Sequence, residues 1–154
     1  MAASSAHIRS ILGPRPIAQR ERSIIDVELS ERTAALKARL DLKPGAVASP
    51  ISAPRAVKPM ALIYKVMGKM FAILSVRGPE NVILKCDPDL AEVLREQYAG
   101  VGHRSHLDRR FWICVDLDAD VPTEEIERLC AGSYDLVCAG LTRKQKAELA
   151  GHAA

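Results

Sequence analysis

The side chains most capable of chemistry are concentrated in residues 103–118, HRSHLDRRFWICVDLD. His103 and His106 are separated by two residues and Asp108 follows them, so this stretch holds metal-ligand residue types. A histidine pair in a loop lacks the third fixed ligand of a zinc site. The alternating acids of CVDLDADVP lack the glycine and the closing glutamate of a calcium loop. We therefore expect no metal ion here, and we expect Asp120 to cap the helix that follows.

The same stretch also has the residue types that bind phosphate. Arg109 and Arg110 directly precede Trp112, and guanidinium groups there could contact phosphates with the indole as a lateral stop. The alternative is a solvated basic loop that leads into a strand. Strand alternation places Trp112, Cys114 and Asp116 on one face, and Phe111, Ile113, Val115 and Leu117 on the other. We expect the all-apolar face to be buried and Trp112 to lie on the open or partly covered side.

Catalytic patterns are missing from the sequence. It has no glycine-rich phosphate loop, no nucleophile elbow and no credible cysteine–histidine pair. The four cysteines lie in apolar runs and have no CxxC-type spacing, which favours reduced, buried thiols in a cytoplasmic protein: Cys86, Cys114, Cys130 and Cys138. We therefore predict that the protein is not an enzyme and needs no cofactor.

Charge is distributed unevenly along the 154 residues. Residues 1–70 hold 12 Lys and Arg against 5 Asp and Glu, or +7, while residues 71–154 hold 10 against 14, or −4, which together give the net charge of +3. A basic front half permits a surface that faces a polyanion.

No apolar run is long enough to span a membrane. We expect residues 1–28 to form a basic, disordered tail and residues 29–150 to form a single domain.

The pattern of apolar residues, caps and turns predicts an antiparallel α+β fold with helices on one sheet face. Ser30 and Asp87 are the expected caps of two helices, and Thr142 of a short final one. Met67-Gly68 is the expected turn of a hairpin. Helices are expected at 30–40, 87–98, 121–141 and 143–150, a proline-rich extended connector at 44–59, and strands at 61–66, 69–76, 81–86 and 111–117.

Three lysines lie on or beside the strands of the predicted three-stranded meander: Lys65, Lys69 and Lys85. Alternation puts Lys65 on the face of Ile63 and Lys85 on the face of Ile83, which does not by itself give them a common face. The hairpin tip at Lys69 could act as a basic wing against a polyanion. The alternative is an exposed lysine that only serves the turn.

From Tyr64 to Leu149 the chain closely resembles the MmcQ/YjbR family. The matching pieces, in family order, are YKVMGKMFAIL, VILKCDPDLAEVLREQYAGV, HLDRRFW, VDLDADVP and SYDLVCAGL. The resemblance implies a two-layer, CyaY-like (frataxin-like) α+β fold with an antiparallel sheet. It also implies DNA binding, which in this family is attributed to a double-wing arrangement of hairpins. The segment ASPISAPRAVKPMA has no counterpart in the family pattern.

The loop of the family signature is only partly kept in this chain. The family pattern, tyrosine-His-Met-Asn-basic-basic-His-Trp, is matched at His106, Arg109, Arg110 and Trp112. Ser105, Asp108 and Phe111 stand in the places of its tyrosine, asparagine and second histidine. Aspartate only accepts hydrogen bonds and repels phosphate, so Asp108 weakens the DNA interpretation.

We predict a cytoplasmic, non-enzymatic DNA-binding protein that contacts the phosphate backbone through basic hairpin and loop residues. The alternative is a module on the same fold that binds a protein or a small ligand instead of DNA. The predicted DNA-binding residues are Lys65, Lys69, Lys85, His106, Arg109, Arg110 and Trp112.

Overall fold

The computed structural model describes residues 29–52, 54–55, 58–103 and 105–153. The predicted tail, residues 1–28, lies outside the described residues. The helices are α3 (Glu31–Asp41), α4 (Pro88–Gln97), α5 (Thr123–Ala139) and α6 (Arg143–Ala153). The strands are β1 (Ala46–Ile51), β2 (Ala61–Val66), β3 (Lys69–Ser75), β4 (Asn81–Lys85), β5 (Val101–Gly102) and β6 (Trp112–Asp116).

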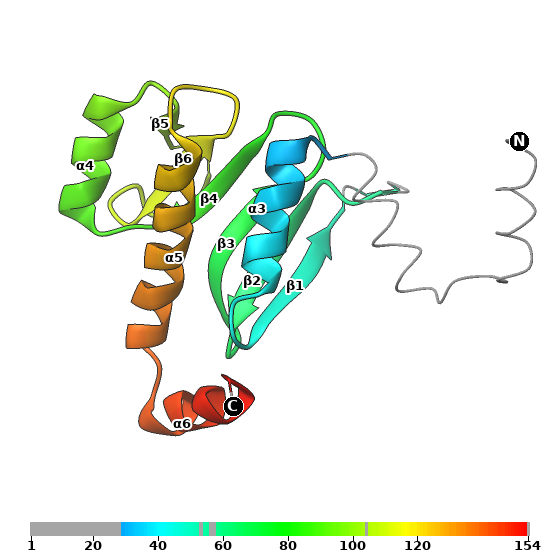
Figure 1. The fold of residues 1–154 in the computed structure, drawn as a ribbon, viewed down its shortest axis with the longest axis vertical. Helices are drawn as coiled ribbons and strands as arrows, with labels where there is room; N and C mark the ends of the chain where they lie inside the picture. The colour runs from blue at the N-terminus through cyan, green and yellow to red at the C-terminus, as the bar shows by residue number, and fades with distance from the viewer. Residues whose placement is uncertain (1–28, 53, 56–57, 104, 154) are drawn as a thin grey trace, which may run out of the picture.

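The strands form one six-stranded antiparallel sheet in the order β1-β2-β3-β4-β6-β5. Helices α3 and α5 lie side by side across one face of this sheet (Figure 1). Helix α4 lies beside β5, and α6 follows α5 at the end of the chain (Figure 1). The predicted α+β class is therefore confirmed, with α3 and α5 on the same sheet face.

The β2–β3 hairpin forms where the sequence predicts it. Met67 and Gly68 both have positive φ angles, 49° and 79°, as the two central residues of a type I′ turn require. Gly68 adopts this backbone without strain because it has no Cβ atom. The register shifts between Tyr64 and Lys65, so Phe71 is the extra residue of a β-bulge. The bulge places both Phe71 and its neighbour Ala72 in the buried core.

Ser133 of α5 joins the helix layer to the sheet at the point where β3 and β4 separate. Its hydroxyl accepts from the Lys85 N–H at 2.9 Å and donates to the Phe71 carbonyl at 2.5 Å. The β3–β4 pairing ends one residue earlier, at Ala72 and Leu84. Ser133 is completely buried, so its hydroxyl satisfies two backbone groups that water cannot reach. The position of Lys85 is therefore set by α5 as well as by the sheet.

Three predicted helix caps are confirmed. The side chain of Ser30 accepts from the Thr33 N–H, and Asp87 accepts from the first turn of α4. Thr142 accepts from the Gln145 N–H, while the Gln145 side chain accepts from the Thr142 N–H. These reciprocal bonds satisfy amide groups that have no partner inside the first turn of a helix.

Two strands were not predicted. Strand β1 lies within the proline-rich connector, and Pro50 fits there because β1 is an edge strand of the sheet. Its side chains are mostly exposed, so it has no apolar alternation to mark it. Strand β5 is only two residues long and is defined by its pairing with β6.

The prediction that Asp120 caps a helix is wrong. Helix α5 begins after Pro122 without a side-chain cap. The Asp120 carboxylate instead accepts from the Ala99 and Gly100 N–H groups, each at 2.8 Å. These bonds, that to Gly100 first, lower the pKa of Asp120. Asp120 therefore fixes the turn between α4 and β5.

Candidate functional site

The register of the sheet places Lys65 and Lys85 on a common face. Ile63, Ile73 and Ile83 stand opposite one another on β2, β3 and β4, and directly paired residues share a face. Lys65 lies two residues after Ile63, and Lys85 two residues after Ile83, so both lysines share the face of the isoleucines. We call this face, opposite α3 and α5, the open face.

Trp112 extends this arrangement onto the next strand. It is paired with Lys85, and Cys114 is paired with Ile83. Lys65 and Lys85 lie two strands apart, or about 10 Å at the usual strand spacing. Lys65 is exposed, while Lys85 and Trp112 are half-buried. Three predicted site residues are therefore gathered at one end of the open face, and Trp112 lies on the expected side of its strand.

A hollow of about 400 Å³ lies where β4 and β6 meet α5, because Leu136 of that helix lines it together with the ends of the two strands. Its lining includes Lys85 and Trp112, and also Phe111, whose side chain is 37% exposed. The expectation that the whole all-apolar face of 111–117 is buried is therefore wrong at Phe111, because β6 begins only at the next residue. The other members of that face, Ile113, Val115 and Leu117, are buried.

The loop before β6 holds two arginines in different electrostatic states. Arg110 donates from Nη2 and Nε to the Asp108 carboxylate at 2.8 and 3.2 Å, and its backbone N–H donates to the same carboxylate at 3.0 Å. The hydrogen bond from Arg110 lowers the pKa of Asp108, and the same bond raises the pKa of Arg110. Arg109 is exposed, and no hydrogen bond or ion pair of its side chain occurs within the described part of the chain. Arg109 is the guanidinium that can accept a new anion.

Arg95 of α4 positions this loop, and sequence reasoning missed it. Its Nη2 donates to the carbonyls of Arg109 at 2.6 Å and Trp112 at 3.0 Å. His103 Nδ1 lies 3.4 Å from the same Trp112 carbonyl. Arg95 is 14 and 17 residues away from its two partners, so only the tertiary fold brings them together.

Two predicted residues lie apart from this group. Lys69 is at the tip of the β2–β3 hairpin, where its Nζ donates to the Gly140 carbonyl at 3.0 Å. This carbonyl is at the end of α5, where a cation is favoured by the helix dipole. His106 is exposed in the loop between β5 and β6. Neither residue lines the hollow.

The acids and histidines of the structure do not gather into a metal site. Across the described residues, no group of three or more His, Cys, Asp or Glu side chains could hold a metal ion. In the same residues, Cys86, Cys114, Cys130 and Cys138 form no disulfide. Burial raises the pKa of Cys86 to about 11 and that of Cys130 to about 12, so neither thiol is a reactive thiolate at neutral pH.

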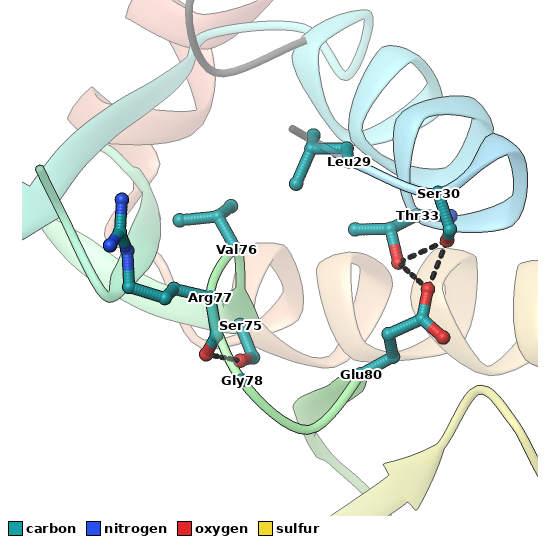
Figure 2. Close-up of a pocket in the computed structure, with 8 residues that line it drawn as sticks. All are labelled: Leu29, Ser30, Thr33, Ser75, Val76, Arg77, Gly78 and Glu80. Carbon is teal, nitrogen blue, oxygen red and sulfur yellow. Dashed lines mark hydrogen bonds between the residues drawn. The ribbon is translucent and has the colours of Figure 1, made fainter. Parts of the chain in front are cut away.

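A second hollow, of about 420 Å³, lies between the start of α3 and the β3–β4 turn. Figure 2 shows the Glu80 carboxylate reaching Ser30 and Thr33, with Arg77 on the other side of the hollow. The hydrogen bond from Ser30 is the main cause of the lowered pKa of Glu80. Arg32 also pairs with Glu80, at 3.1 Å. These polar groups satisfy one another, and we interpret the cluster as an anchor for the turn.

The fold and site define a small α+β protein with a basic, aromatic hollow at one end of an antiparallel sheet. The sequence profile of the YjbR family matches residues 43–136. The chain belongs to the YjbR family, as the resemblance to MmcQ/YjbR proteins predicted. The match begins and ends earlier than the stretch from Tyr64 to Leu149 on which that resemblance rests.

Individual relatives agree with this assignment. The chain is 38% identical to the uncharacterised protein YjbR of Escherichia coli K12 over 71 residues, or 46% of this chain and 60% of YjbR. It is 26% identical to the uncharacterised protein YbdF of E. coli O157:H7 over 85 residues, or 54% of this chain and 70% of YbdF. The alignment with YjbR thus spans less than two thirds of that protein's length.

A solved structure shares the fold. The crystal structure of Deinococcus radiodurans protein DR2400, a DUF419 domain, superimposes with a TM-score of 0.64 at 30% sequence identity. The superposition covers 75% of this chain and 85% of the DR2400 chain.

No helix in the described residues of this protein is long and apolar enough to cross a membrane.

Proposed function

We propose that this protein is a non-enzymatic DNA-binding protein of the cytoplasm whose open face contacts the phosphate backbone through Lys65, Lys85 and Arg109. The observation that carries the proposal is the common location of Lys65 and Lys85, beside Trp112 and the loop of Arg109. None of the three cations has an acidic partner among the residues described by the structure. Phosphate oxygens are the natural partners of such exposed cations.

The fold contributes to the proposal in two ways. Helices α3 and α5 cover one face of the sheet, as a CyaY-like fold would require, and leave the opposite face to carry the cations. The β2–β3 hairpin is the element that would act as a wing, with Lys69 at its tip. Because Lys69 already donates to the end of α5, we assign it a smaller share of the binding than Lys65.

Binding should be tested with fluorescently labelled DNA at low salt. Replacing Lys65 and Lys85 by Ala should weaken binding, because two phosphate contacts are lost and their counterions are no longer released. The matched control is Arg39→Ala, since Arg39 is an exposed cation on α3 that pairs with Glu127 on α5. Equal affinity of the double variant and the wild-type protein would remove the open face from the binding site.

A protein partner is the second candidate, and the isoleucine row favours it. Ile63, Ile73 and Ile83 are each half-buried on the open face, and Val47 on the neighbouring edge strand is 62% exposed. Contiguous exposed apolar residues are typical of protein interaction surfaces. A partner that is captured equally well after nuclease treatment, together with no DNA binding at low salt, would select this candidate.

A further inference from the structure

The hollow at the end of β4 and β6 gathers the features that bind an unpaired nucleobase. Six aromatic residues are present in the chain, and Phe111 and Trp112 both line this one hollow. Phe111 is the exposed one, and the Arg110 guanidinium carbon lies 5.2 Å from the centre of its ring. Because Arg110 is in turn held by Asp108, the ring is supported on one side by a fixed ion pair.

The remaining lining combines an apolar wall with charge at the rim. Pro88, Cys86 and Leu136 add apolar surface, and Leu136 is 40% exposed. Lys85 supplies a positive charge and Asp87 a negative one. The Asp87 carboxylate also caps α4, because it accepts from the Asp89 and Leu90 N–H groups. A hollow of about 400 Å³ is within the size range of small-ligand sites. This combination fits a flat, apolar ring system attached to an anion.

We propose that this hollow holds one unpaired base of a single-stranded nucleic acid, with the adjoining phosphates on Lys85 and Arg109. The inference rests on the proposed function and specifies its ligand. In a duplex the bases are stacked on one another, so their faces cannot reach Phe111 or Trp112. In a single strand every base has a free face, and an aromatic side chain beside a basic surface binds it without regard to sequence.

The test compares three oligonucleotides of equal length at 50 mM salt: a single strand, the duplex of the same sequence, and an abasic strand that keeps the phosphates. Trp112 is the sole tryptophan, so its emission reports directly on the hollow. The single strand should quench this emission and bind about 10-fold more tightly than the duplex or the abasic strand, as expected for one base stacked on an aromatic ring.

Phe111→Ala should lower the affinity for the single strand about 10-fold and leave the affinity for the duplex unchanged. Only the ring is lost, because the bond from the Cys86 N–H goes to the Phe111 backbone carbonyl. Phe111→Leu, which keeps an apolar side chain without the ring, should show the same loss and provides the comparison if the alanine variant is unstable. The matched control is Val93→Ala, an exposed apolar residue of α4 outside the hollow, which should bind like the wild-type protein.

The outcomes separate this inference from the proposed function. If the single strand and the duplex bind equally and Phe111→Leu changes neither affinity, the hollow does not hold a base, while the phosphate contacts stand. If none of the three oligonucleotides binds, the proposed function itself is overturned, and this inference with it.

Discussion

Asp108→Asn should strengthen nucleic-acid binding, although it alters no residue that we assign to the phosphates. In the structure the Asp108 carboxylate accepts two hydrogen bonds from the Arg110 side chain. These bonds occupy the Arg110 guanidinium, the second one of the loop. Asparagine has the same size and can still accept the Arg110 backbone N–H through its remaining oxygen, a bond of 3.0 Å in the wild-type protein. The loop should therefore keep its shape while one negative charge is removed. Arg110 keeps its Nε bond to the same oxygen but loses the acceptor of its Nη2, so this end of the guanidinium becomes available to a phosphate.

The size of the effect follows from counterion release. Three phosphate contacts by Lys65, Lys85 and Arg109 give a slope of log affinity against log salt of about −2.1 for a single strand and −2.7 for a duplex. A fourth contact by Arg110 adds about −0.7 to −0.9 to that slope. Between 50 and 200 mM salt, the variant should lose about threefold more affinity than the wild-type protein loses.

Fluorescence anisotropy at four or five salt concentrations measures this slope. Adding Arg110→Ala to Asp108→Asn should return the slope to its wild-type value, whereas Arg110→Ala alone should change it little. Arg109→Ala alone should reduce its magnitude by about 0.7 to 0.9. An unchanged slope in Asp108→Asn, or equal losses from Arg109→Ala and Arg110→Ala, would refute the assignment of different roles to the two arginines.

Three further predictions concern residues that hold the site in place. Ser133→Ala should destabilise the protein by about 1–3 kcal/mol in urea unfolding, because two buried backbone groups lose their partner. The control Ser75→Ala removes a hydroxyl from a half-buried residue whose one hydrogen bond, to the Arg77 carbonyl, is exposed to solvent, and it should change stability by less than about 0.5 kcal/mol. Arg95→Ala should weaken nucleic-acid binding and alter Trp112 emission without changing the salt slope; a reduced slope would mean that Arg95 itself contacts phosphate. Asp120→Asn should lower the urea midpoint more at pH 7 than at pH 3. The folded-state pKa of Asp120 is lowered, so its carboxylate stabilises the fold fully above the ordinary aspartate pKa, about 3.9, and loses this effect progressively as the pH falls toward the lower folded value. An equal loss at both pH values would contradict that sign.

The features that sequence predicted well depend on local chemistry. Ser30, Asp87 and Thr142 cap their helices, and Met67-Gly68 forms the hairpin turn, because each of these motifs is completed within a few residues. The same holds for the face of Trp112, which follows from alternation along one strand.

The features that sequence missed depend on pairing across the fold. Strand β1 contains Pro50 and mostly exposed side chains, so only its pairing with β2 identifies it as a strand. The common face of Lys65 and Lys85 requires the register of three strands, which alternation within each strand cannot supply. Arg95 reaches its partners from another element, and nothing in its sequence neighbourhood indicates that role.

The prediction that Phe111 is buried was wrong for a different reason. Alternation assigned it to the buried face, but the strand starts one residue later, and at that boundary the ring remains partly exposed beside Arg110. The residue that sequence reasoning assigned to the core is thus the one on which the inferred base site depends.

The most direct test of the account is the salt dependence of nucleic-acid binding by the wild-type protein and by the triple variant Lys65→Ala, Lys85→Ala and Arg109→Ala. We predict a slope of log affinity against log salt between about −2 and −3 for the wild-type protein, and a slope near zero with greatly weakened binding for the triple variant. The Arg39→Ala control should retain the wild-type slope. A wild-type protein that does not bind at 50 mM salt, or a triple variant with an undiminished slope, would contradict the claim that this end of the open face binds phosphate.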